Sequence, residues 1–351
     1  MKNNNSKKKF NGSVKFYSKK CVICSSANNL EPFIVTNDIR IAQNVTTVIC
    51  NSCGLIFLNP APTDESYMEF YQNQRGGEVS RKTKYEFLYK KEYLHRLIVQ
   101  ILVDNIPLLK DSNTIDVGSG NGAFLHYLKP YVGILKALEV SKNAQIDIPR
   151  FFNCEVIEDY TLKNIVDFGS LDLLTSNAVI EHYNDPHVAL KDYYDALRPG
   201  GRLLIYTHNI KGLSFSAGEN SYFKFIHPYY FSPNTLRILV KKSGFNNIKI
   251  FDFPCNDKYR SICSPSRVLS GFFVLIAEKT NNIEEGNLDI NGIQEVDESR
   301  EALHGARIIE KKFFFKKMIY YFISLLRIGK INKSCDLYND AYVSYMQSRE
   351  K

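Results

Sequence analysis

The segment "NTIDVGSGNGAFLHYL", residues 113–128, constrains the fold more than any other part of the chain. It joins a short β-branched run to a helical pattern through a turn that contains Gly118, Gly120 and Gly122. Glycines between a strand and a helix let the backbone pass close to a bound molecule, because no Cβ blocks the approach. The segment therefore predicts a strand, turn and helix of an α/β sheet that binds a nucleotide-like ligand.

Short β-rich runs alternate with helical patterns from about residue 114 to residue 280. The β-rich runs are "TIDV", "VGILKALEV", "CEVIE", "LDLLTS", "GRLLIYTH", "IKIFDF" and "GFFVLIAEK". Alternation of this kind is typical of a doubly wound, mostly parallel sheet with helices on both faces. We therefore expect an α/β fold with a Rossmann-like sheet.

Two Cys-x-x-Cys pairs precede this region, "CVIC" at Cys21 and Cys24 and "CNSCG" at Cys50 and Cys53. Short β segments lie between the pairs, which is the arrangement of a zinc ribbon. Four thiolates complete the tetrahedral shell of Zn²⁺ and leave no open position, so we expect a structural metal site. Four reduced cysteines without a metal are the alternative.

The patterns divide the chain into six parts, each with its own composition. They are a basic disordered tail (1–20), a zinc-binding ribbon (21–62), a helical connector (63–110), the α/β domain (111–280), an acidic linker (281–299) and a helical C-terminal extension (300–351). The extension is rich in basic and aromatic residues over 307–328. Packing on the main body is the first interpretation of that segment, and a peripheral membrane or protein contact is the alternative.

The net charge of +8 is concentrated at the start of the chain, because the first twenty residues contain seven lysines and no acid. The region that follows is nearly neutral, so a nucleic-acid partner is not expected from composition. We find neither the apolar core of a secretory signal nor an apolar run of the roughly 20 residues that a membrane span needs. A cytoplasmic location is the resulting expectation.

The glycine turn alone does not identify its ligand, since "GSGNGA" also fits the dinucleotide fingerprint and leaves an NAD-dependent oxidoreductase open. Three neighbouring features favour S-adenosylmethionine. Asp116 ends the first strand, where it can face the ammonium group of the ligand, and Glu139 ends the next strand, where a carboxylate suits a ribose diol. A Pro-Gly-Gly turn precedes the fifth strand.

The ordered motifs "IDVGSGNG", "LEVS", "LDLLTSNAVIEHYNDP", "ALRPGGRLLI" and "IHPYYFSPNTLRILVKKSGF" resemble those of class I S-adenosylmethionine-dependent methyltransferases. With the cysteine pairs ahead of them, residues 21–280 are similar to bacterial methyltransferases with an N-terminal zinc-binding segment, often associated with modification of sugars or natural products. The resemblance implies a seven-stranded sheet whose last strand is antiparallel. It places Asp116, Gly118, Gly120 and Gly122 around the methionine part, Glu139 on the ribose, Asp159 near the adenine and Asn177 near the methyl donor.

Methyl transfer to a hydroxyl requires a base, and two histidines lie where the mouth of the site is expected. His182 follows the fourth strand, and His227 lies in the aromatic segment "NSYFKFIHPYYF". Each has a structural alternative, and Tyr222, Tyr229 and Tyr230 of that segment can line the acceptor pocket or simply pack.

The predicted reaction is methylation of a small, carbohydrate-containing acceptor, with oxygen as the favoured atom. Carbon methylation of a keto sugar is a weaker alternative, because deoxysugar C-methyltransferases have a Glu where this chain has Ile226, and they continue into a second α/β domain. About fifty residues follow the acidic linker here, which is too short for such a domain. The activities of an RNA methyltransferase and of an NAD-dependent oxidoreductase also stay open at this point.

Overall fold

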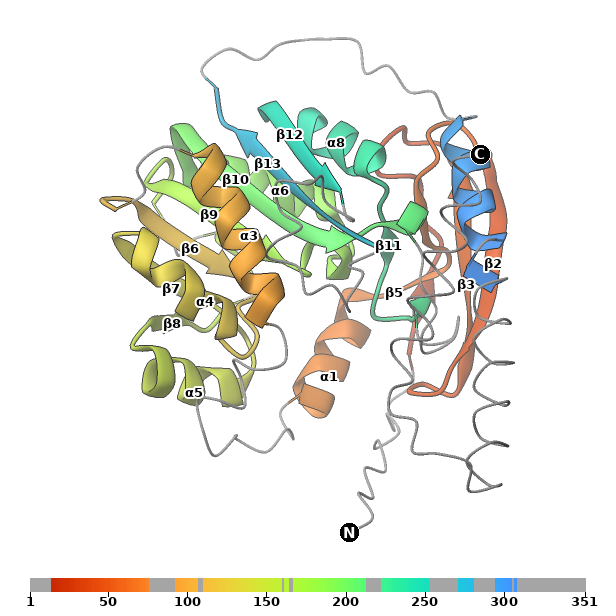
Figure 1. Ribbon diagram of the computed structural model, residues 1–351. Coiled ribbons are helices and arrows are strands. Elements are labelled where there is room, and N and C mark those ends of the chain that lie inside the picture. The colour runs from red at the N-terminus through yellow and green to blue at the C-terminus, as the bar shows by residue number, and fades with distance from the viewer. Residues whose placement is uncertain are drawn as a thin grey trace, which may run out of the picture.

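The computed structural model describes residues 14–75, 92–106, 110–159, 161–163, 167–212, 222–252, 271–280, 294–304, 306 and 307. Figure 1 shows a large central sheet flanked by helices, with a smaller sheet beside it that is built mostly from the N-terminal part of the chain. Apart from its first residue, the segment 307–328, for which a membrane or protein contact was an alternative, lies outside the described residues.

The large sheet has seven strands in the order β12-β13-β10-β9-β6-β7-β8. Strands β8, β7, β6, β9 and β10 run parallel, whereas β13 is antiparallel to both β10 and β12. The predicted seven-stranded α/β fold is therefore confirmed, with its last strand antiparallel. The strands are β6 (Asn113–Val117), β7 (Ile134–Leu138), β8 (Glu155–Ile157), β9 (Leu171–Asn177), β10 (Leu197–His208), β12 (Asn246–Asp252) and β13 (Phe272–Glu278).

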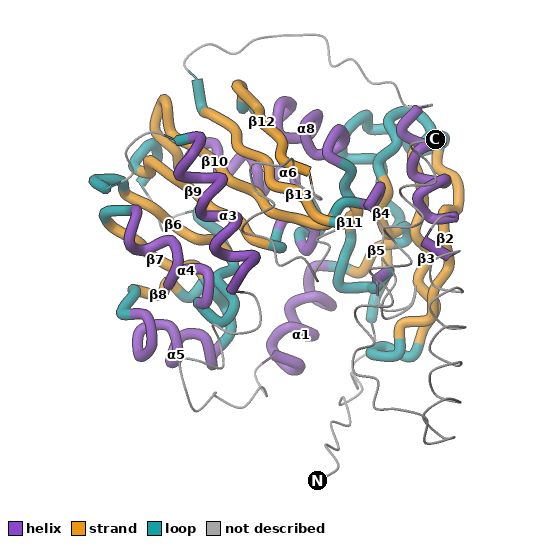
Figure 2. Tube along the Cα trace, in the orientation of Figure 1, coloured by secondary structure: helices purple, strands orange, loops and turns teal. Residues whose placement is uncertain are grey.

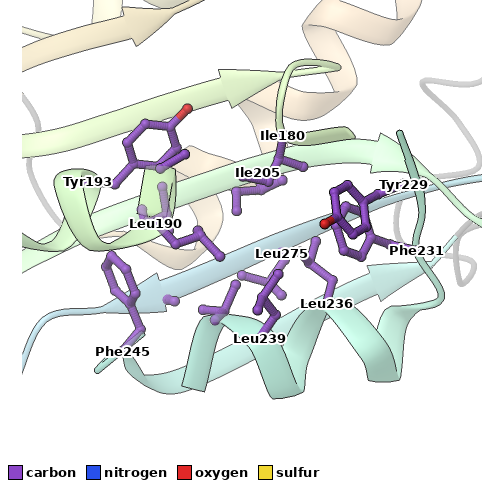
Figure 3. Packing of buried hydrophobic residues seen from close by; sticks show 14 of the residues in the cluster. Ile180, Leu190, Tyr193, Ile205, Tyr229, Phe231, Leu236, Leu239, Phe245 and Leu275 are labelled. Atoms are coloured by element: carbon purple, nitrogen blue, oxygen red, sulfur yellow. The ribbon is translucent and has the colours of Figure 1, made fainter. Parts of the chain in front are cut away.

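Helices cover both faces of this sheet because its strands carry buried apolar residues on each side. Residues of α3, α4 and α5 form one core with the sheet, and residues of α6 and α8 form another on the opposite face. Figure 3 shows the second core, which includes Leu190 of α6, Leu239 of α8, Phe245 and Leu275 of β13. The helices are α3 (Glu92–Asn105), α4 (Ala123–Leu128), α5 (Lys142–Phe152), α6 (Pro186–Ala196) and α8 (Pro233–Lys242), with 3-10 turns η1 (Lys129–Tyr131), η2 (Ile180–His182) and η3 (Ile210–Gly212).

The cysteine-containing part forms a second, antiparallel sheet in the order β11-β4-β3-β2. Its long hairpin consists of β2 (Leu30–Asp38) and β3 (Gln43–Cys50), which follow the first cysteine pair in the sequence and end at Cys50 of the second. Figure 2 shows these two strands at the edge of the molecule. β4 (Ile56–Leu58) pairs with β3 on one side and on the other with β11 (Tyr229–Tyr230), which comes from the α/β part of the chain. The ribbon is thus completed by a strand that lies far away in sequence.

Both ends of the described chain are more ordered than the sequence suggested. The end of the expected disordered tail forms β1 (Phe16–Tyr17), which pairs with β5 (Ala61–Pro62) ahead of α1 (Asp64–Arg75). Residues 294–304 are helical, so a helix begins inside the segment expected as an acidic linker. That helix lies against β2 and β3 in Figure 1, and its buried Glu295 accepts hydrogen bonds from Lys211 Nζ at 2.8 Å and Ser232 Oγ at 2.8 Å. These bonds explain the order, because they satisfy a carboxylate that would otherwise be buried alone.

In the part of the chain that the structure describes, no helix is both long and apolar enough to cross a membrane.

Candidate active site

The glycine turn after β6 has the backbone conformation that only glycine adopts without strain. Gly118 and Gly122 have φ values of +65° and +76°. A Cβ at Gly118 would lie 2.4 Å from the Val179 side chain, and one at Gly122 would lie 2.8 Å from Ile148. Close packing therefore requires glycine at both positions. Gly120 differs, because a Cβ there would meet nothing closer than the Gly118 carbonyl at 4.0 Å, and the turn is open to a ligand at this point.

Asp116 is buried at the end of β6, with 1% of its surface exposed. One carboxylate oxygen, Oδ1, accepts hydrogen bonds from Thr175 Oγ1 at 2.6 Å and from Asn177 Nδ2 at 3.0 Å. Burial raises the pKa of Asp116 to about 6, although these hydrogen bonds work in the opposite direction. Asn177, expected near the methyl donor, is thus held by Asp116 and does not line the cavity described below.

Glu139 follows β7, and its carboxylate links the loop after β7 to the glycine turn through hydrogen bonds. Its carboxylate accepts the backbone N–H of Gly120 at 2.7 Å and that of Ser141 at 2.9 Å. The side chain is buried, yet it lines a cavity at the carboxyl ends of the parallel strands. A carboxylate held by two amide donors presents its remaining lone pairs in a fixed direction, which suits recognition of a pair of hydroxyl groups.

The cavity has a volume of about 500 Å³, and its lining combines apolar residues with several carboxylates. Four of the residues predicted from the sequence line it: Gly118, Glu139, Asp159 and His182. The remaining predicted site residues, Asp116, Gly120, Gly122, Asn177 and His227, lie around the cavity without lining it. Its further lining residues are Asp64, Tyr67, Met68, Val117, Leu138, Val140, Thr161, Ala178, Val179, Tyr183, Asn184, Asp185, Val188, Ala189 and Asp192.

One wall of the cavity comes from α1, which the sequence did not single out. Asp64, Tyr67 and Met68 of this helix face the loop after β9, and Asn184 of that loop donates a hydrogen bond to Asp64 Oδ1 at 2.6 Å. The Asn184 Oδ1 atom is buried and has no hydrogen-bond partner among the described residues. The acids of the first turn of α1 were the only signal available, and a helix start explains such acids equally well.

His182 is the histidine that lines the cavity. Its Nδ1 atom lies 2.7 Å from the Ile226 carbonyl oxygen. A carbonyl can only accept, so Nδ1 carries the proton, and in the neutral ring the lone pair is on Nε2. The chain therefore holds His182 in the tautomer that leaves Nε2 able to accept a proton.

His227 and His208 lie next to His182 and form a histidine cluster with it. The His227 ring centroid is 4.8 Å from that of His182 and 5.5 Å from that of His208. Burial, followed by the charges of the two neighbouring imidazoles, holds the pKa of His227 well below its usual range. His227 is therefore a neutral ring at pH 7.

A buried carboxylate, Glu181, contacts this cluster through His208. It accepts a hydrogen bond from Thr207 Oγ1 at 2.9 Å, and its other oxygen lies 3.2 Å from His208 Nδ1. Burial opposes ionisation of Glu181, but the His208 hydrogen bond and the charges of His182 and His208 outweigh it and lower the pKa. His208, the last residue of β10, was not predicted from the sequence; its place at the end of a strand, at the edge where the cavity opens, was the signal that could have found it.

The tyrosines of the same segment are packed. Tyr229 stacks on Phe57 at 6.0 Å, and the Tyr230 hydroxyl accepts the Lys224 backbone N–H at 2.8 Å. Neither these two nor Tyr222 line the cavity.

The four predicted cysteines converge, with their sulfur atoms all within 4.8 Å of one another. Cys21 and Cys53 sulfurs are 3.4 Å apart, and those of Cys24 and Cys50 are 3.5 Å apart. A tetrahedral Zn²⁺ with Zn–S bonds of about 2.3 Å separates its sulfurs by roughly 3.8 Å, so the spacing fits this metal. The backbone at Cys24, Ser52 and Leu55 favours the thiolate forms of Cys21, Cys50 and Cys53, because it lowers the pKa of each thiol against the effect of burial. The cluster is placed to bind zinc.

Residues 89–250 match the family model described as a methyltransferase domain. Among curated relatives, the chain is 26% identical over 165 residues to a tRNA U34 carboxymethyltransferase of Ruthia magnifica, an alignment covering 43% of this chain and 51% of that protein. It is also 26% identical over 144 residues to a ubiquinone biosynthesis O-methyltransferase of Coxiella burnetii, covering 34% of this chain and 59% of that protein. The chain thus spans about half to three fifths of the length of these relatives.

Solved structures with a similar fold include an S-adenosylmethionine-dependent methyltransferase of Thermotoga maritima, described as a possible histamine N-methyltransferase. It is 24% identical, with a TM-score of 0.42, and the match covers 56% of this chain and 93% of that one.

Proposed function

The chain contains a class I S-adenosylmethionine-dependent methyltransferase domain, and from this we propose that the protein transfers a methyl group to a hydroxyl of a small, carbohydrate-containing acceptor. The observation that carries the proposal is the cavity that brings Glu139 and His182 together. Glu139 can accept hydrogen bonds from the ribose hydroxyls of the cofactor, and His182 can accept the proton of an acceptor hydroxyl.

The described residues fit S-adenosylmethionine in size and chemistry. A cavity of about 500 Å³ lies within the range of roughly 300–1,000 Å³ that is usual for small ligands. Val117, Leu138 and Val140 offer apolar contact to an adenosine, while Glu139 offers acceptors to its ribose. When bound, the cofactor supplies a methyl carbon on a sulfonium that is already a leaving group.

We assign the base to His182. Methylation of a hydroxyl forms an O–CH₃ bond and breaks the O–H bond, so a nearby group must take that proton. His182 lines the cavity and carries its Nδ1 proton toward the Ile226 carbonyl, whereas His227 does not line the cavity. The buried Glu181 carboxylate favours the imidazolium that forms on His182, because the two groups attract one another.

The acceptor side supports a ligand that donates hydrogen bonds. Asp64, Asp185 and Asp192 contribute carboxylates, which are hydrogen-bond acceptors, to the lining. Sugar hydroxyls match such a surface, because they can donate hydrogen bonds to carboxylates.

The test is methyl transfer from labelled S-adenosylmethionine to a panel of sugars and sugar nucleotides by the wild-type chain, the His182→Gln variant and the His227→Asn variant. We expect His182→Gln to lower the transfer rate by roughly 10²- to 10⁴-fold and to leave cofactor affinity unchanged. If His227→Asn lowers the transfer rate more than His182→Gln does, the base would be His227. Absence of transfer to every hydroxyl acceptor, with cofactor bound, would refute the proposed acceptor class.

An RNA acceptor is the second candidate, because curated relatives are described as tRNA U34 carboxymethyltransferases and the first twenty residues contain seven lysines. Phosphate contacts by lysines make binding depend steeply on salt. Binding of tRNA that weakens by a thousandfold or so between about 50 and 200 mM salt would favour this candidate. Weak, salt-independent binding would exclude it.

A further inference from the structure

The segment 222–230, which we term the histidine loop, is bonded to the ribbon along its length. Thr36 Oγ1 of β2 donates to the Phe223 carbonyl at 3.0 Å, and the Asp38 carboxylate accepts the Phe225 N–H at 3.0 Å. On the other side, the Leu58 N–H donates to the Pro228 carbonyl at 2.9 Å. Both Thr36 and Asp38 are buried, so these bonds are shielded from water.

Phe225 is held most firmly of these residues. The Tyr67 hydroxyl of α1 donates to its carbonyl, so both polar groups of its backbone are bonded to the N-terminal part of the chain. Its ring stacks parallel to Tyr67 with centroids 6.0 Å apart and meets Phe70 edge-on at 4.6 Å. The two peptide groups that flank Phe225 are thus each fixed by one hydrogen bond, and moving either would break a bond to the N-terminal part of the chain.

The next carbonyl in the loop, that of Ile226, accepts the Nδ1–H of His182 at 2.7 Å. The direction of this carbonyl depends on the Phe225 peptide, since the two are separated by one pair of backbone torsions. The bonds from Asp38 and Tyr67 therefore fix the group that determines the tautomer of His182.

One residue of the cysteine cluster, Cys50, is the last residue of β3. Cys50 follows Ile49 in β3; Ile49 pairs with Ile56 of β4, which in turn pairs with Tyr230 of β11. The path from a metal ligand to the end of the histidine loop thus crosses three adjacent strands.

From this geometry we infer that the ribbon is a positioning element of the methyl-transfer site, in which Asp38 and Thr36 hold the histidine loop so that the Ile226 carbonyl keeps the proton of the neutral His182 ring on Nδ1. The inference rests on the proposed function for its chemical consequence. It assigns to the zinc-binding part a role in the reaction beyond stability.

The experiment uses the full zinc-loaded chain and compares Asp38→Ala with Val35→Thr. Val35 is on the same strand but is 56% exposed, so its variant is a matched control. The tautomer of His182 is measured by ¹⁵N NMR of histidine-labelled protein, with His182→Gln used to assign the signal. Zinc per chain, cofactor affinity and transfer rate are measured on the same samples.

We expect Asp38→Ala to populate the Nε2–H tautomer of His182 and to lower the transfer rate by on the order of tenfold or more, since a histidine in the wrong tautomer is a poor base. Zinc content and cofactor affinity are expected to stay within about twofold, and Val35→Thr is expected to match the wild type. If Asp38→Ala does not fold, Thr36→Val makes the smaller change, and Thr36→Ser is expected to restore the wild-type tautomer.

A folded, zinc-loaded Asp38→Ala or Thr36→Val protein with the wild-type His182 tautomer would overturn the inference. The NMR measurement needs no acceptor. Absence of methyl transfer by the wild type would therefore count against the proposed function alone, and the position of the histidine loop would still be tested.

Discussion

Replacing Asp116 by Asn is expected to stabilise the protein and, at the same time, to weaken cofactor binding. The Asp116 carboxyl is fully buried, and the side chains of Thr175 and Asn177 both donate to its Oδ1 atom. An Asn side chain keeps an acceptor oxygen in that place and removes the negative charge. The variant therefore separates the cost of the buried charge from the hydrogen bonds that orient the side chain.

The magnitude follows from the pKa of Asp116, which burial raises from 3.8 to about 6. A carboxyl whose pKa is raised on folding contributes its full stability below the unfolded value of 3.8 and loses it as pH rises through about 6. Two pKa units correspond to roughly 3 kcal/mol at pH 7. Asp116→Asn avoids this loss, so its melting temperature is expected to equal that of the wild type at pH 4 and to exceed it by roughly 5 to 10 °C at pH 7.

The effect on cofactor binding is expected to have the opposite sign. Asp116 does not line the cavity, but it directly precedes the lining residues Val117 and Gly118, so its negative charge is expected to attract the ammonium group of S-adenosylmethionine. Only the ionised form of Asp116 offers that charge, so wild-type affinity is expected to fall about tenfold between pH 7 and pH 5. In Asp116→Asn the affinity is expected to be weak and independent of pH over this range. Thermal denaturation and calorimetric titration at both pH values measure the two effects. Equal melting temperatures at pH 7, or a wild-type affinity that does not change with pH, would refute the reasoning.

Three further variants test the rest of the site. Glu139→Ala should weaken S-adenosylmethionine binding by about 10- to 150-fold in calorimetry, the effect of losing hydrogen bonds to a charged group; unchanged affinity would give this acid another role. Cys53→Ser should reduce bound zinc from about one equivalent per chain to near zero, as measured by elemental analysis, and should unfold the ribbon, as followed by limited proteolysis. A variant that is folded without metal would show that zinc has no structural role. Glu181→Gln should lower methyl transfer without changing cofactor affinity, because the imidazolium formed on His182 loses its buried counter-charge; an unaltered rate would make Glu181 purely structural.

The fold was predictable because its signals are local. A β-branched run, a glycine turn and a helical pattern each span a few residues, and their alternation is sufficient to predict a parallel sheet. The antiparallel direction of β13 came from the family resemblance. Cys21, Cys24, Cys50 and Cys53 were also predictable as a cluster, since their spacing is itself the motif.

The cavity was predictable only in part, because its walls come from segments far apart in the chain. Gly118 and Glu139 follow strands whose carboxyl ends meet at one edge, so they were found by position, whereas Asp159 came from the family resemblance. The wall formed by α1 depends on how the ribbon docks, which no local pattern reports. The pairing of β4 with β11 is equally hidden, since two residues of each strand give no register.

Ile226 shows why a comparison of side-chain motifs does not detect a contact made by a backbone group. The motif describes side chains, and at this position an expected acid is replaced by an apolar residue, which weakened the carbon-methylation alternative. In the structure the useful group is the Ile226 backbone carbonyl, which takes the Nδ1–H of His182. Every residue has such a carbonyl, so what makes this one specific is its direction, and that direction depends on Asp38 and Tyr67, which lie 187 and 158 residues away from Phe225 in the sequence. Chemistry that depends on backbone groups is invisible to residue identity, and only the long-range contacts that fix the backbone reveal it.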